Sequence, residues 1–175
     1  MDLPRRLTFL SRVIGASRFD IQTYEEVEAD HTALGQAIGV VVVSSLAAGI
    51  GIGGTTAAAL AVTVVSLMGW AFWAWVTYVI GVQVFPTKQT DADWGQLLRT
   101  TGFSASPGML RMLGILPGLT KIVFLICTIW MLATFIMAVR QALDYASVWR
   151  AVGVCCFGWV VYVVLFFVLD RSQVY

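Results

Sequence analysis

The chain contains no Asp, Glu, Lys or Arg between Asp30 and Lys88, its longest stretch without a formal charge. A water-soluble domain cannot cover so long a segment without charged side chains on its surface. A helix that crosses a bilayer needs roughly 20 apolar residues, because the hydrocarbon layer is about 30 Å thick and a helix rises about 1.5 Å per residue. The stretch therefore predicts two consecutive transmembrane helices.

Composition extends this interpretation to the whole chain. The 175 residues are 59% hydrophobic and 12% charged, whereas roughly 25% of residues are charged in an ordinary soluble domain. A chain of this length has room for four or five membrane helices but for no second soluble domain. We expect a single all-α polytopic membrane bundle whose partners include membrane lipids. The net charge of +1 does not indicate a nucleic-acid partner.

Residues 1–30 are expected to form a cytoplasmic segment that is first amphipathic and then acidic. From about Leu3 to Ala16, apolar residues recur at steps of three and four, the period of an amphipathic helix. Arg5, Arg6 and Arg12 are predicted on its polar side, where they contact anionic lipid while the apolar side enters the membrane surface. Packing of this helix on a partner subunit is the alternative. The stretch from Asp20 to Asp30 is predicted to be a short linker or helix with exposed carboxylates at Glu25, Glu26 and Glu28.

Residues 31–175 are expected to form a bundle of five transmembrane helices. The third is a short piece between Pro107 and Pro117, too brief for a full crossing and interrupted by Arg111. A second interfacial helix is predicted from Thr87 to Phe103, with Asp91 as its N-cap. The four longer helices are predicted from about Thr32 or Gly35 to Gly53, Ala57 to Phe85, Leu119 to Val139 and Val152 to Leu169.

The distribution of Lys and Arg predicts a cytoplasmic N-terminus. With five crossings, most cations fall on the N-terminal side of the membrane and only Lys121 and Arg171 fall on the other side. If the piece between Pro107 and Pro117 dips into the membrane and returns, four crossings remain and both termini are cytoplasmic. The count of charges alone does not separate these two arrangements.

Arg111 is the most costly residue of the chain if it lies at depth, at about 2.5 to 3.5 kcal/mol at a helix centre. Pro107 and Pro117 free backbone groups that only protein or water can satisfy inside a bilayer, which favours the bundle interior for this piece. The alternative is that Arg111 snorkels to the cytoplasmic interface from a tilted helix. Arg140 and Asp144, one helical turn apart, are predicted to form a solvated pair at a helix end.

The second predicted transmembrane helix carries more aromatic mass than one interfacial belt needs. Trp70, Trp73 and Trp75 are therefore candidates for contact with lipid or with a partner, together with the three arginines of the N-terminal helix.

No set of residues in the sequence predicts catalysis, a cofactor or a metal. The only histidine, His31, lies at the predicted membrane edge, without the partners that activate a nucleophile. Gly49, Gly51 and Gly54 spell GxGxxG, but apolar helices flank it on both sides, whereas a dinucleotide site needs a strand before the loop. The three cysteines lie in apolar segments without a CxxC spacing. We expect a protein that is not an enzyme.

The second half of the chain has a recognisable order of features. A Gly-aromatic pair precedes a proline-bounded short helix, and a long apolar helix with a tryptophan then leads to a further helix that opens with a basic-Ala pair. These features stand at Gly102–Phe103, Pro107–Pro117, Trp130, Ala138–Leu143 and Arg150–Ala151. Together with the segment from Tyr24 to Ala37, the pattern resembles bacterial members of the Yip domain family, named for interaction with Ypt and Rab GTPases.

The resemblance implies five crossings in the cytoplasmic (inner) membrane of a bacterial cell, a cytoplasmic N-terminus and an extracytoplasmic C-terminus. The chain lacks the long N-terminal region and the aspartate-leucine-tyrosine-glycine-proline type motif of the eukaryotic relatives, so the resemblance implies a fold without a Rab-binding role. The hypothesis that fits best is an accessory or scaffold subunit of a larger membrane complex, or a membrane organiser, that binds protein partners through its transmembrane helices. The alternative is a small-molecule or lipid transporter that uses the broken third helix around Arg111.

Overall fold

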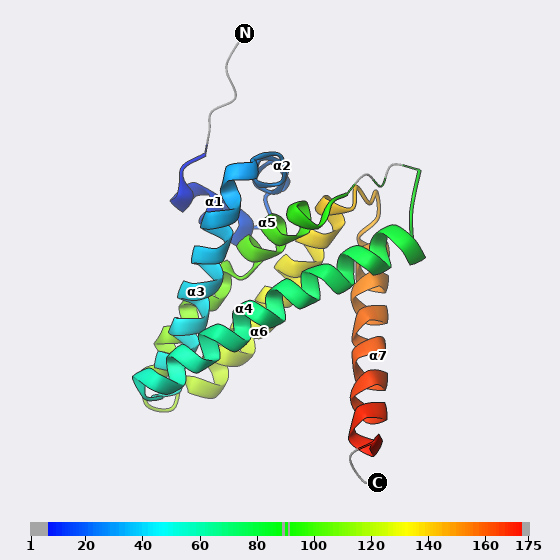
Figure 1. The fold of residues 1–175 in the computed structure, drawn as a ribbon. Helices are drawn as coiled ribbons and strands as arrows, with labels where there is room; N and C mark the ends of the chain where they lie inside the picture. Colours follow the sequence, from blue (N-terminus) through cyan, green and yellow to red (C-terminus); the bar gives the residue numbers. More distant parts are fainter. Residues whose placement is uncertain (1–6, 89, 91, 173–175) are drawn as a thin grey trace.

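The computed structural model describes residues 7–88, 90 and 92–172, and the side chains of these residues apart from 162 and 164–172. The described chain is helical throughout, and Figure 1 shows its elements. Seven α-helices are joined by short turns and three shorter helices, η1 to η3. They are α1 (Phe9–Ser17), α2 (Ile21–Ala29), η1 (His31–Ala33), α3 (Leu34–Gly51), α4 (Thr56–Val79), η2 (Ile80–Val84), α5 (Trp94–Ser104), η3 (Ser106–Ile115), α6 (Thr120–Ala142) and α7 (Val148–Ser172).

Three helical segments of the described chain are long and apolar enough to cross a membrane. They are His31–Gly51, Thr56–Val84 and Thr120–Ala142, and their ends lie within a few residues of the predicted ones. A shorter apolar stretch, Val148–Val161, opens α7, which begins a turn earlier than predicted. The prediction of an all-helical fold is confirmed for the described residues, and their apolar helices are compatible with a membrane location.

The proline-bounded piece continues a longer helical segment. We call Trp94–Ile115, which consists of α5 and η3, the broken segment. Asp93 caps α5 in a reciprocal pair of hydrogen bonds with Gln96, so Asp93 has the role predicted for Asp91, which lies outside the described residues. Pro107 is buried in the first turn of η3, where its missing N–H leaves no helical bond unmade.

The broken segment packs between α3 and α6 and follows α3 along its length. Gly102 lies against Ala37 near the start of α3, and Gly114 lies against Gly51 at its end. Thr134 of α6 donates a hydrogen bond to the carbonyl oxygen of Ser104 at 2.7 Å, at the junction of α5 and η3. The proline-bounded piece is therefore enclosed by protein on two sides, as its freed backbone groups require.

Glycines allow the close approach of α3, α4 and η3. A Cβ atom at Gly51 would overlap the carbonyl oxygen of Arg111, and one at Gly49 would lie 2.6 Å from the Cβ of Ala59. The turn after α3 has Gly53 at φ +69°, a conformation that favours glycine. The GxGxxG pattern thus belongs to a tight helix contact and its turn.

Two clusters of buried apolar side chains hold the helices together near the end that carries α1 and α2. The first joins α1, α2, η1, α3, α5 and α6, through Ala16, Tyr24, Val27, Ala33, Ala37, Val40, Phe103 and Ala138. The second joins α4, η2, α5, α6 and α7, through Ala74, Ile80, Leu97, Val139, Ala142, Leu143, Tyr145, Ala151 and Val154.

Candidate functional site

An ion-pair network lies where α1 and α2 meet the bundle. Its centre is Arg12, whose side chain is 3% exposed. The Nη2 atom lies 2.6 Å from Oδ2 of Asp30 and 3.1 Å from Oε1 of Glu26, and Nη1 donates to Oε1 of Gln36 at 2.9 Å. The prediction that Arg12 lies on a polar outer face and contacts lipid is therefore wrong, because its guanidinium points into the protein. Arg5 and Arg6 lie outside the described residues.

The opposite charges of this network stabilise each other's ionised forms. Burial lowers the pKa of Arg12, but the hydrogen bonds and charges of Asp30 and Glu26 outweigh it and raise the pKa above its ordinary value. The pKa of Asp30 is lowered to about 2 by the Thr32 hydroxyl and by Arg12, which both donate hydrogen bonds to it. The outer face of α1 is apolar instead, with Phe9, Leu10 and Ile14 among its exposed residues.

Glu28 of α2 has an unusual environment. It was predicted to be exposed, but its side chain is only partly exposed. Its pKa is raised to about 7, mainly by burial and also by the charge of Asp144, against the charge of Arg99, which lowers it. The buried Arg99 guanidinium donates through Nε and Nη2 to the carbonyl oxygen of Glu28, at 3.1 and 2.6 Å, and so satisfies a carbonyl in the last turn of α2.

We expect the stability of the protein to fall as the pH rises from 5 to 8, because of Glu28. The folded pKa of about 7 exceeds the ordinary value of 4.5, so the contribution is fully present below pH 4.5 and is lost as the pH rises through about 7. Glu28→Gln should flatten this dependence and raise the free energy of unfolding at pH 8 by about 2 kcal/mol, less than the full shift implies because solvent screens this partly exposed group. Thermal unfolding in mild detergent at several pH values measures it. Glu25→Gln, which changes an exposed carboxylate of the same helix and removes only a minor contribution to the pKa of Glu28, is the control and should keep most of the slope.

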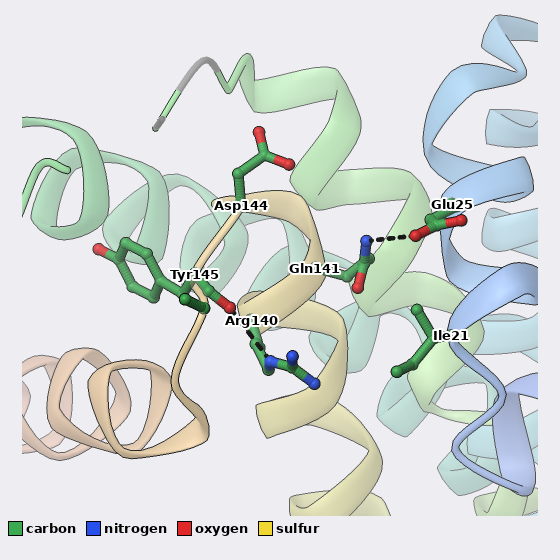
Figure 2. Close-up of a pocket in the computed structure, with 7 residues that line it drawn as sticks. Ile21, Glu25, Arg140, Gln141, Asp144 and Tyr145 are labelled. Atoms are coloured by element: carbon green, nitrogen blue, oxygen red, sulfur yellow. Dashed lines mark hydrogen bonds between the residues drawn. The ribbon is translucent and has the colours of Figure 1, made fainter. Parts of the chain in front are cut away.

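A polar groove of about 550 Å³ lies at the same end of the bundle, between α2 and the end of α6 (Figure 2). Arg140 and Asp144 both line it, but Figure 2 shows their side chains pointing apart. Asp144 has a φ of 51° just after α6 ends, and the Nε of Arg140 donates to the carbonyl oxygen of Tyr145 at 3.1 Å. Gln141 donates to Glu25 across the groove at 3.3 Å. The two predicted partners therefore share a groove without pairing with each other.

A second groove, of about 520 Å³, lies deeper in the bundle and contains Arg111. We call it the Arg111 groove. Its floor is formed by α3, α5 and η3, and α4 and α6 line its sides. Arg111 supplies its formal charge, and the rest of the lining is apolar or hydroxylic, with Ser44, Ser45, Ser66, Thr101, Ser104 and Thr128 among the hydroxyl groups.

The guanidinium of Arg111 is only partly satisfied. Its Nη2 donates to Oγ1 of Thr128 at 3.0 Å, and its Cζ lies 5.4 Å from the centre of the Phe124 ring. Its Nε is buried without a hydrogen-bond partner. Arg111 is at the end of α3 opposite α1 and α2, because its carbonyl oxygen lies against Gly51. The predicted alternative, in which Arg111 snorkels to the cytoplasmic interface, stays a prediction. Pro117 is exposed in the turn after η3.

The tryptophans predicted to contact lipid or a partner have two different environments. Trp70 and Trp73 both line the Arg111 groove, where Trp70 donates from Nε1 to Oγ1 of Thr101 at 3.1 Å. Trp75 is 48% exposed on the outer face of α4. Trp130 of α6 packs near α1 and donates to the carbonyl oxygen of Ser17 at 2.8 Å.

Two buried tyrosines that were not predicted tie the elements of the polar end together. The hydroxyl of Tyr24 lies within 3.1 Å of the Ala16 carbonyl oxygen and 3.3 Å of the Thr134 carbonyl oxygen, and so joins α2 to α1 and α6. The hydroxyl of Tyr145 lies 3.2 Å from the carbonyl oxygen of Gly81 and 2.9 Å from that of Phe85, at the end of η2. Burial raises the pKa of both groups. The sequence gives little indication of these contacts, since single tyrosines beside apolar runs are common.

The comparison with protein families, curated proteins and solved structures finds no match to the chain. The resemblance to the Yip domain family therefore rests on the sequence pattern. Within the described residues, no group of three or more His, Cys, Asp or Glu side chains is arranged to hold a metal ion. The arrangement offers instead a polar end with an ion-pair network around Arg12 and a deeper groove lined by one cation.

Proposed function

We propose that this chain is a non-enzymatic integral membrane protein that acts by association, as an accessory subunit or scaffold of a larger membrane complex. The proposal includes membership of a bacterial branch of the Yip domain family, on the sequence pattern alone. The observation that carries it is Trp159 of α7, a large aromatic side chain that is 63% exposed away from both ends of its helix.

The proposed topology has five crossings, formed by α3, α4, the broken segment, α6 and α7. The broken segment supports this count because a 3-10 helix rises about 2.0 Å per residue, more than an α-helix, so that α5 and η3 placed end to end measure about 36 Å. The ends of the bundle differ in charge, which supports a cytoplasmic N-terminus. Arg140 lies at the α2 end and Lys88 and Arg150 line one pocket at the start of α7, whereas Lys121 follows the turn at the opposite end.

The packing of α7 supports a protein partner. Ala151 and Val154 are buried in the second core cluster, and Phe157 packs edge-on against Phe85, with ring centres 5.6 Å apart. Beyond this contact, Figure 1 shows α7 running apart from α3, α4 and α6 towards the C-terminus. The helix therefore has a side that no other element of the described residues covers.

Trp159 lies on this part of α7, about 16 Å from the start of the helix. That distance places it near the middle of a hydrocarbon layer about 30 Å thick. Tryptophan is enriched at membrane interfaces, where its N–H finds polar groups, rather than at the centre of the bilayer. A transmembrane helix of a partner protein can cover this ring and offer a hydrogen-bond acceptor, which lipid tails cannot.

A photo-crosslinking amino acid at position 159 tests this proposal in native membranes. We expect a crosslink to one membrane protein and co-purification of that protein in mild detergent. The same probe at position 125 of α6, where Leu125 is equally exposed, is the control and should give no protein crosslink. A monomer without crosslinks from position 159 would contradict the proposal.

A further inference from the structure

The Arg111 groove has the size and the lining of a ligand site. Its volume of about 520 Å³ lies within the range of roughly 300 to 1,000 Å³ that is typical of such sites. Trp70, Trp73, Met131, Leu132 and Phe135 give it an apolar lining away from Arg111. One end of the groove is therefore cationic and the remainder suits a hydrocarbon chain.

The groove opens towards the surroundings of the bundle. Among the described residues, α4 packs on α3 and α5 and α6 packs on α5 and η3, but α4 and α6 make little contact with each other. Val62, Gly69, Thr128 and Leu132, on the two sides of the groove, are exposed. In a membrane, the molecules that reach this opening are the lipids of the bilayer.

Arg111 lacks the acceptors that a guanidinium in an apolar environment needs. Its Nε is buried without a partner, and its one side-chain hydrogen bond is to the neutral hydroxyl of Thr128. An unsatisfied charged group away from water is costly, so an anionic oxygen from a ligand is favoured at this position. Guanidinium groups bind phosphate oxygens through two parallel hydrogen bonds.

The groove has a cation at one end and aromatic side chains at the other, which matches the headgroup and the acyl chain of a lipid. Arg111 and Thr128 lie towards the turn between η3 and α6, and Trp70 and Phe135 lie towards the end that carries α1 and α2. We propose that the groove binds one anionic phospholipid of the surrounding bilayer, with its phosphate on Arg111 and Thr128. One acyl chain then runs between α4 and α6 towards Trp70 and Phe135. This binding site is independent of the partner proposed for α7.

Native mass spectrometry of the purified full chain tests this site. The protein in mild detergent is mixed with equal amounts of phosphatidylglycerol and phosphatidylcholine, and the retained lipids are counted. We expect one tightly held phosphatidylglycerol, retained at least about tenfold better than phosphatidylcholine. Equal retention of the two lipids, or retention of neither, would overturn the proposal.

Two pairs of variants distinguish loss of lipid binding at the groove from a general effect of the substitution on the protein. Arg111→Ala should reduce phosphatidylglycerol retention at least about tenfold, whereas Lys121→Ala, which removes an exposed cation near the same end, should not. Gly69→Leu should also abolish retention, because a Cβ at Gly69 meets open space beside the groove and a leucine there fills it. Gly35→Leu is its control, since Gly35 also has open space around it but does not line the groove.

These pairs keep the proposal testable if Arg111→Ala does not fold. Normal retention by Gly69→Leu would exclude the groove as the lipid site. Displacement of phosphatidylglycerol by millimolar glycerol phosphate would show a site for a free anion and would also overturn the lipid assignment.

Discussion

Arg12→Leu is expected to lower the free energy of unfolding by about 3 kcal/mol in mild detergent at pH 7. The substitution leaves Glu26 and Asp30 without their cation, although their side chains are only 25% and 23% exposed. Breaking a fully buried pair in this way costs about 3 to 5 kcal/mol, and the partial exposure of the two carboxylates reduces the cost. Thermal and denaturant unfolding, followed by tryptophan fluorescence, measures the change.

Arg18→Leu is the matched control for this prediction. Arg18 is an exposed residue directly after α1, so its loss should change stability by less than about 0.5 kcal/mol. The triple variant Arg12→Leu, Glu26→Gln and Asp30→Asn should recover part of the loss, because it removes the orphaned charges as well. If Arg12→Leu is as stable as Arg18→Leu, the network around Arg12 does not hold α1 on the bundle.

The pH dependence of the same variant provides a second check. The folded pKa of Asp30 is about 2, below the ordinary value of 3.8. The stability that Asp30 contributes is therefore present above pH 3.8 and is lost as the pH falls through about 2. The difference in stability between the natural chain and Arg12→Leu should shrink over this acidic window and stay constant between pH 5 and 7.

The apolar helices could be predicted from the sequence because their signal is local. A run of about 20 apolar residues meets the thickness of a bilayer without any knowledge of tertiary contacts, and Pro86 and the glycine-rich turn mark the helix ends. The start of α5 was placed less well, because Asp91 and Asp93 both suit an N-cap and only the bond to Gln96 separates them.

The position of Arg12 could not be predicted from its own helix. An arginine beside an apolar stripe is normally placed on the solvated face. Its partners Glu26 and Asp30 come close only because the chain reverses at Phe19, which has a φ of 63°. Glu28 was misjudged for a similar reason, since Arg99, which donates to its carbonyl oxygen, is 71 residues away.

The sequence places Arg111 as a charge inside an apolar segment, but its surroundings needed the structure. The sequence shows that a charged residue at membrane depth is costly. It does not show that Thr128 lies within hydrogen-bond reach or that α4 and α6 leave a groove between them. Whether a charge at depth lies at an interface or beside a ligand site depends on such contacts between distant segments.

Gly51→Ala is expected to destabilise the bundle by about 3 kcal/mol, because the contact between α3 and η3 has no room for a methyl group. A Cβ atom at this position would overlap the carbonyl oxygen of Arg111 and lie 3.0 Å from Cε2 of Phe124. The first of these atoms belongs to the backbone, so a rotamer change cannot relieve the overlap, and η3 must move away from α3. The displacement carries Arg111 with it, so Gly51→Ala should also weaken phosphatidylglycerol retention.

Gly35→Ala, at an open position of the same helix, should instead stabilise the protein by about 0.5 to 1 kcal/mol through helix propensity. Thermal unfolding of both variants in the same detergent gives the comparison, and an equal midpoint for the two would show that η3 does not depend on Gly51.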